Sequence, residues 1–126
     1  MAIQVGDKIP SVKLKRTDMS DVTTDELFGG KKVVLFSVPG AFTPTCSEKH
    51  LPGFIEKADE LRAKGVDEIV CTAVNDAFVM DAWAKDRGAS DNVTLIADRN
   101  GDLVKALGLD FDGSNIGFGL RGQRFA

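Results

Sequence analysis

Several residue types and patterns that define particular protein classes are scarce in this sequence. One histidine excludes a metal site built from several histidines. The two cysteines show no regular framework, which suits a reducing compartment such as the cytoplasm. The longest apolar runs fall far below the roughly 18 residues of a membrane span. The first residues lack the basic region and apolar stretch of a signal peptide. We therefore expect neither a membrane anchor nor export.

Positive charge is also in deficit. The net charge is −3 and the isoelectric point is near 5.1, which argues against nucleic acid or an anionic membrane as a partner. A hydrophobic content of 43% and a charged content of 28% are typical of a soluble globular protein. The length of 126 residues predicts one domain over residues 1–126.

Apolar runs alternate with amphipathic segments along the chain, which predicts an α/β fold. Buried strands are expected at 32–38, 69–74 and 93–97. One helix is expected from about Cys46 to Lys64, because its apolar residues share one face. A second helix is expected from a cap at Asn75 and Asp76 to about Arg87. Its predicted inward-facing residues are Phe78, Val79, Ala82 and Trp83.

The remaining segments give shorter signals. Residues 3–14 alternate weakly and predict an extended segment or hairpin. Thr23 and Glu26 form a capping box for a short helix that stops at Gly29. A further short helix is expected at 103–107, closed by glycine. Residues 110–119 are predicted to form a loop, and residues 120–126 to begin another strand.

Cys46 is the most informative residue of the chain. It follows an apolar strand and a short turn, and it stands at the predicted start of a helix. A thiol in that place meets unpaired backbone N–H groups and the positive end of the helix dipole, and both favour the thiolate. We therefore expect the pKa of Cys46 to lie below that of a free cysteine, which makes it a candidate nucleophile.

The residues around Cys46 form a longer motif. Pro39, Thr43 and Cys46 give P-x-x-x-T-x-x-C, and the whole run reads PGAFTPTCS-x-x-HLPGF. This run resembles the peroxiredoxins, and in particular their type II branch. The similarity extends from Val5-Gly6-Asp7 to Arg124-Phe125, nearly the whole chain.

The resemblance implies a thioredoxin-like fold with an N-terminal extension and a central mixed sheet flanked by helices. It implies a peroxidase that reduces hydrogen peroxide and alkyl hydroperoxides without metal, flavin or haem, because sulfur carries the redox change. It also implies an external thiol reductant, either glutathione with glutaredoxin or thioredoxin, and a homodimer. Peroxiredoxins continue past their Arg-Phe pair into further strands and a helix, so we expect the C-terminal part of the family fold to lie outside these residues.

The resemblance assigns the site residues. Cys46 is the nucleophile, Thr43 places its hydroxyl beside the sulfur, and Pro39 shields the pocket from water. Arg124, which precedes Phe125, matches the arginine that donates to sulfur and peroxide, and Arg121 is a near alternative. His50 follows Cys46 by one helical turn, where it supports either the thiolate or a docking surface, or has only a structural role.

Other interpretations stay open. Cys71 lies in an apolar strand and is expected to be a small buried residue rather than a second reactive thiol. A thiol–disulfide oxidoreductase is the alternative enzyme, although the sequence has no C-x-x-C. A redox-sensing or holdase protein whose thiol is a switch is the alternative without catalysis.

Overall fold

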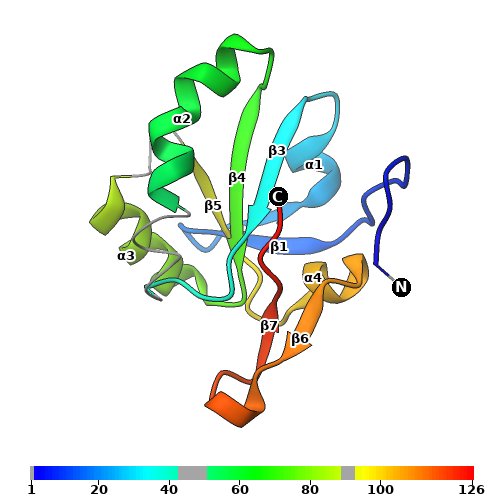
Figure 1. The fold of residues 1–126 in the computed structure, drawn as a ribbon, viewed down its shortest axis with the longest axis vertical. Coiled ribbons are helices and arrows are strands. Elements are labelled where there is room, and N and C mark those ends of the chain that lie inside the picture. Colours follow the sequence, from blue (N-terminus) through cyan, green and yellow to red (C-terminus); the bar gives the residue numbers. More distant parts are fainter. Residues whose placement is uncertain (1, 43–50, 89–92) are drawn as a thin grey trace.

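The fold is built on a five-stranded mixed sheet (Figure 1). The computed structural model describes residues 2–42, 51–88 and 93–126. The strand order is β2-β1-β5-β4-β3. Three of these strands are parallel neighbours, namely β3 (Val33–Ser37), β4 (Glu68–Ala73) and β5 (Thr94–Ala97). The two others form an antiparallel hairpin, β1 (Lys13–Arg16) and β2 (Asp21–Thr23), and β1 pairs with β5.

Helices cover both faces of this sheet. One apolar cluster joins the sheet to α2 (Leu51–Ala63) and α3 (Ala77–Arg87). A second cluster joins it to α1 (Thr24–Phe28) and α4 (Asp102–Leu107). Because side chains alternate along a strand, Cys71 of β4 packs in the first cluster and Val70 in the second. The central strands are thus buried on both sides, as their continuous apolar sequences predict.

The predicted caps are present. Thr23 precedes α1, and its side chain accepts a hydrogen bond from the backbone N–H of Glu26. Asp76 precedes α3 and accepts from the backbone N–H of Val79 at 2.8 Å. The expected inward face of α3 is wrong in part, because Phe78 is 71% exposed and Ala82 is also exposed. The buried face consists of Ala77, Met80, Trp83 and Ala84.

The C-terminal region contains more structure than the expected loop. A two-stranded antiparallel sheet joins β6 (Asp110–Asp112) to β7 (Leu120–Gly122), with the 3-10 helix η2 (Ser114–Ile116) between them. Beyond β7 the chain turns back to the main sheet, where Phe125 forms an isolated antiparallel bridge with Ser37 of β3 (Figure 1). The C-terminal segment is therefore a further neighbour of β3, placed beside its carboxyl end.

Candidate active site

The candidate site lies where β3 and β4 end. Carboxyl ends of parallel strands meet at one edge of a sheet, which is where open α/β sheets commonly bind ligands. The turn 38–42 leaves this edge, and the backbone N–H of Val38 donates to the carbonyl of Thr72 at 3.1 Å. Pro39 lies in this turn and is half-buried. The turn leads directly into the segment that carries Cys46.

The predicted site residues divide into two groups. Pro39, Arg121 and Arg124 belong to the described part of the chain, and the structure brings all three to the carboxyl end of β3. Thr43, Cys46 and His50 lie outside the described residues, so their assigned roles remain predictions.

Arg121 connects three segments that are distant in the sequence. Its Nη1 donates to the carbonyl of Pro39 at 3.2 Å and to the carbonyl of Val74 at 3.4 Å. Its Nε donates to the carbonyl of Phe118 at 3.0 Å, and the guanidinium carbon lies 5.1 Å from the centre of the Phe118 ring. A planar guanidinium has five N–H donors in a fixed fork, which suits such a junction. Arg121 thus holds the ends of β3 and β4 to the tip that precedes β7.

Arg124 lies on the segment that bridges to β3. The backbone N–H of Ser37 donates to the carbonyl of Phe125 at 2.9 Å, which fixes this segment against the last residue of β3. Phe125 packs in the cluster on the α1 and α4 side of the sheet. Because extended residues alternate, the exposed Arg124 lies on the opposite side, which α2 and α3 cover. This is the side from which α2 begins.

Gly122 lets β7 approach the sheet this closely. A Cβ atom at this position would lie 2.7 Å from Cγ1 of Val104 and 2.9 Å from Oγ of Ser37. Both neighbours are completely buried. Gly122 separates the two arginines in sequence, so its packing on α4 and β3 sets the position of the backbone that carries both.

Two residues of the site did not emerge from the sequence. The side chain of Asn75 accepts a hydrogen bond from the backbone N–H of Ala41 at 2.9 Å, so it holds the turn after β3, whereas the cap of α3 is Asp76. Phe42 adopts a positive φ of 62°, and its ring lies 6.5 Å from the Trp83 ring. A polar residue directly after a buried strand was the one available signal for Asn75, since its partner is distant in sequence.

The elements behind the turn are firmly packed. Phe36 of β3 and Phe54 of α2 stack with ring centres 3.9 Å apart and planes 7° from parallel. Cys71 is fully buried in β4, which confirms its interpretation as a core residue. The stacked pair fixes the first turns of α2 against β3, next to the candidate site.

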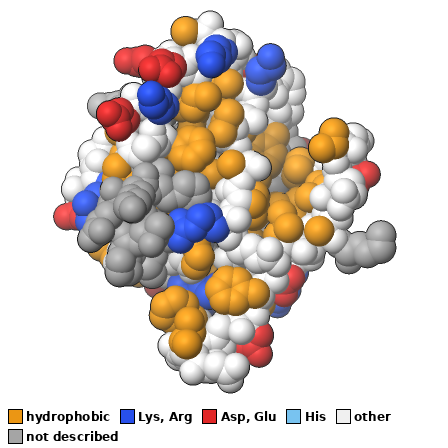
Figure 2. Space-filling view, in the orientation of Figure 1, with side chains coloured by type: hydrophobic (Ala, Val, Ile, Leu, Met, Phe, Trp, Pro, Cys, Tyr) orange, Lys and Arg blue, Asp and Glu red, His pale blue; other side chains and the backbone are white. Residues whose placement is uncertain are grey.

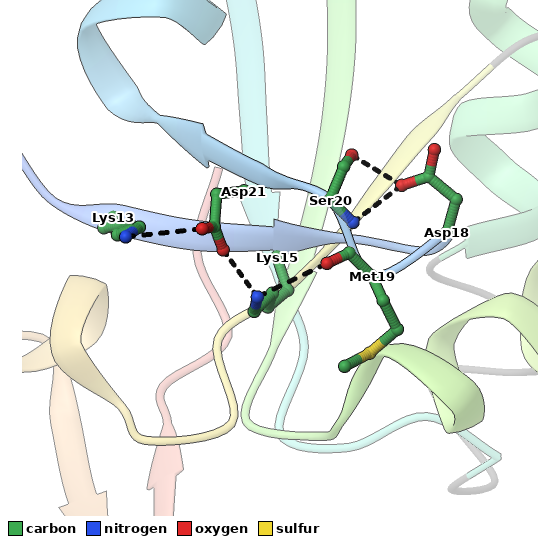
Figure 3. A network of polar contacts seen from close by, with 6 residues as sticks. All are labelled: Lys13, Lys15, Asp18, Met19, Ser20 and Asp21. Carbon is green, nitrogen blue, oxygen red and sulfur yellow. Dashed lines mark hydrogen bonds and ion pairs between the residues drawn. The ribbon is translucent and has the colours of Figure 1, made fainter.

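A separate cleft lies away from this site. It has a volume of about 530 Å³ and lies between the β1–β2 hairpin, the start of α3 and the loop after β5. Figure 3 shows the polar network of the hairpin that forms one wall, in which Asp21 pairs with Lys13 at 3.3 Å and Lys15 donates to the carbonyl of Met19. None of Pro39, Arg121 and Arg124 lines this cleft, so we do not assign the chemistry to it.

A buried carboxyl lies in the wall of the same cleft. Asp98 follows β5 and accepts hydrogen bonds from the backbone N–H groups of Leu103 and Val104, which belong to the first turn of α4. Burial raises the pKa of Asp98 to about 6, although these two hydrogen bonds act in the opposite direction. Within the described ranges, no three His, Cys, Asp or Glu side chains come together in a way that could hold a metal ion.

None of the helices in the described part of the chain has the length and hydrophobicity needed to cross a bilayer.

Comparison with known proteins places the chain. Residues 4–126 match the Redoxin family. The chain is 52% identical to peroxiredoxin-2E, chloroplastic, of Arabidopsis thaliana over 99% of its own length and 56% of that protein's. It is 51% identical to peroxiredoxin-2B of the same plant, covering 98% of this chain and 79% of that one. The chain thus spans only part of these relatives, little more than half of peroxiredoxin-2E.

A solved structure gives the same result. Reduced Prx3 of Vibrio vulnificus in complex with hydrogen peroxide superimposes with a TM-score of 0.92 at 52% identity, over 97% of this chain and 77% of that one. This similarity includes the mixed sheet and both helical layers, which confirms the expected thioredoxin-like fold. The chain therefore belongs to the Redoxin family and, within it, to the peroxiredoxins.

Proposed function

We propose that this protein is a thiol-dependent peroxidase that reduces hydrogen peroxide and small alkyl hydroperoxides at Cys46. The observation that carries this proposal is that two arginines of the C-terminal segment lie beside the turn that follows β3. Arg121 binds the carbonyl of Pro39, and the segment of Arg124 pairs with Ser37. Both arginines thereby lie at the turn that leads to the predicted nucleophile.

The proposed reaction is a displacement at oxygen. The Cys46 thiolate attacks one oxygen of the peroxide, an S–O bond forms and the O–O bond breaks. Sulfur is oxidised to sulfenate, and the departing oxygen takes a proton and leaves as water or an alcohol. Negative charge spreads over sulfur and both oxygens, so fixed donors that face this region lower the barrier. Arg124 is the proposed donor, with Thr43 beside the sulfur.

The other site residues have supporting roles in this proposal. Pro39 lies in the turn and limits the access of water to the sulfur. Arg121 uses donors on the carbonyls of Pro39 and Val74, which supports a positioning role rather than direct contact with peroxide. His50 is proposed to support the thiolate or the docking of a reductant, one helical turn after Cys46.

An external thiol is proposed to complete the cycle. One thiol condenses with the sulfenic acid, the protonated form of the sulfenate, to form a mixed disulfide and water, and a second thiol exchanges to release reduced Cys46. Cys71 is fully buried, which supports recycling by glutathione with glutaredoxin, or by thioredoxin, over an internal disulfide. We also propose a reducing compartment, the cytoplasm, for this chain. Two relatives are named as chloroplastic, so organelle fractionation distinguishes these locations.

We further propose a homodimer that forms near the site. Phe42, Phe78, Ile116 and Phe118 are exposed large hydrophobic residues. Figure 2 shows hydrophobic side chains gathered at the lower end of one face, where Figure 1 places β6, η2 and β7. Arg121 joins the Phe118 carbonyl to the Pro39 carbonyl, so Phe118 lies close to the turn that also carries Phe42. Sedimentation velocity with Phe118→Asp tests this, since a lost contact lowers the mass of the particle.

Stopped-flow mixing of the reduced full chain with hydrogen peroxide tests the function. We expect rapid consumption and the gain of one oxygen atom at Cys46 by intact mass. Cys46→Ser should abolish both signals, whereas Cys71→Ser should keep most of the activity. Equal losses of activity from the two substitutions would indicate that a disulfide between these cysteines forms during the cycle, in place of recycling by an external thiol. Oxidation without turnover in the presence of reductant would instead favour a redox sensor.

A further inference from the structure

Asn75 makes a contact that is unusual for a residue between a strand and a helix. It follows β4 and precedes the Asp76 cap of α3. Its Oδ1 accepts from the backbone N–H of Ala41, which belongs to the turn after β3. Both residues are half-buried. A backbone N–H in such a place needs an acceptor, and the sequence separation of 34 residues shows that the contact depends on the tertiary fold.

The next residue of the turn is strained. Phe42 has a φ of 62°, a conformation that costs a residue with a Cβ roughly 1–2 kcal/mol. Such a conformation persists only where the surroundings enforce it. Two contacts do so here: the Asn75 hydrogen bond holds the preceding peptide, and the Phe42 ring packs against the buried Trp83.

Arg121 holds the other end of the same turn. Its Nη1 binds the carbonyls of Pro39 and Val74, and Val74 directly precedes Asn75. Besides the backbone hydrogen bond from Val38 to Thr72, side chains thus fix the turn to the end of β4 at Pro39, through Arg121, and at Ala41, through Asn75. Thr43 follows Phe42 directly in the sequence. The backbone conformation at Phe42 therefore sets the direction in which the chain continues toward Thr43 and Cys46.

We propose that Asn75 is a positioning residue for the peroxidase reaction, which maintains the strained turn that presents Thr43 and Cys46 to the arginines. This inference rests on the proposed function. Without the acceptor, Phe42 relaxes toward negative φ and the thiolate loses its alignment with the O–O bond. Alignment errors of about 1 Å reduce such rates by roughly 100-fold.

Asn75→Leu removes the acceptor at nearly constant size, whereas Asn75→Asp keeps it. Asp76→Ala is the matched control, because it removes the adjacent cap of α3, whose loss costs about 1 kcal/mol, without touching the turn. The reduced full chain of each variant is mixed with hydrogen peroxide and, separately, with iodoacetamide. Measurements are made well below the melting temperature of each variant and at a pH at which Cys46 is a thiolate. Alkylation needs only an exposed thiolate, so its rate measures the reactivity of Cys46 and does not depend on alignment with an O–O bond.

We expect Asn75→Leu to lower the second-order rate with peroxide by about 10- to 100-fold while the alkylation rate changes little. Asn75→Asp should recover most of the peroxide rate, and Asp76→Ala should lose stability but not rate. Hydrogen exchange at the Ala41 amide should rise in Asn75→Leu alone. If Asn75→Leu and Asp76→Ala lose stability alike and both keep the peroxide rate, Asn75 is merely structural and the inference is overturned. If the parent protein consumes no peroxide, the proposed function is refuted, and the positioning role of Asn75 in it is refuted as well. Hydrogen exchange at the Ala41 amide then still shows whether Asn75 holds the turn.

Discussion

Replacing Gly122 with alanine should disturb the contact that places both arginines. The added Cβ would lie 2.7 Å from Cγ1 of Val104, whereas favourable carbon contacts lie at about 3.5–4.0 Å. The overlap is therefore about 1 Å. Val104 and Ser37 are fully buried, so neither can move into solvent. Overpacking of this kind costs about 1–3 kcal/mol, and we expect Gly122→Ala to destabilise the protein by that amount.

Urea unfolding measures this loss as a lower midpoint at an unchanged slope. Val104→Ala removes the nearer of the two atoms in conflict, so the double substitution should be less destabilising than the sum of the single ones by about 0.5–3 kcal/mol. Gly53→Ala is the control, because a Cβ there meets no atom within 4 Å, and it should stabilise α2 by about 0.5–1 kcal/mol. A Gly122→Ala protein as stable as the parent, or strictly additive substitutions, would refute the reasoning.

Three further outcomes are expected. The raised pKa of Asp98 favours its protonated form in the folded protein, so stability should fall by about 3 kcal/mol between pH 4 and pH 6 and then level off. The free energy of unfolding of Asp98→Asn, measured by urea titration at several pH values, should lack this pH dependence. Parallel plots of stability against pH for the variant and the parent would contradict the role of Asp98. Thr23→Ala should cost about 1 kcal/mol, because it removes the cap of α1; a midpoint equal to that of the parent would argue against the cap. Cys71→Ser should retain peroxide turnover, and a strong loss would assign Cys71 a redox role.

The main elements could be predicted because their signals are local. Continuous apolar runs at β3, β4 and β5 and the caps at Thr23 and Asp76 depend on residues within one element. The short strand β6 was not predicted, because two of its three residues are aspartates, which have low strand propensity, and because it depends on pairing with β7. Phe78 was misplaced, since helical spacing alone does not say which side of α3 meets the sheet.

The site was only partly accessible from the sequence for the same reason. Pro39 belongs to the motif around Cys46, and the family resemblance indicated the two arginines; the structure places all three together. The hydrogen bond from Ala41 to Asn75 joins residues 34 positions apart, and it forms only because β3 and β4 are parallel neighbours. The bonds of Arg121 to two strand ends likewise follow from the fold, so its role in holding them could not be read from local spacing.

The central claim is that the arginines of the C-terminal segment serve the thiol of Cys46. Titration of thiolate absorbance in a Cys71→Ser background tests it most directly, because one reactive thiol then gives the whole signal. We predict that Arg124→Gln raises the pKa of Cys46 and slows peroxide attack more than Arg121→Gln does, because Arg124 is the proposed donor to the sulfur and Arg121 holds the carbonyls of Pro39 and Val74. A larger change in the pKa and the rate from Arg121→Gln would show that Arg121, and not Arg124, is the donor to the sulfur. An unchanged Cys46 titration in both variants would contradict the account.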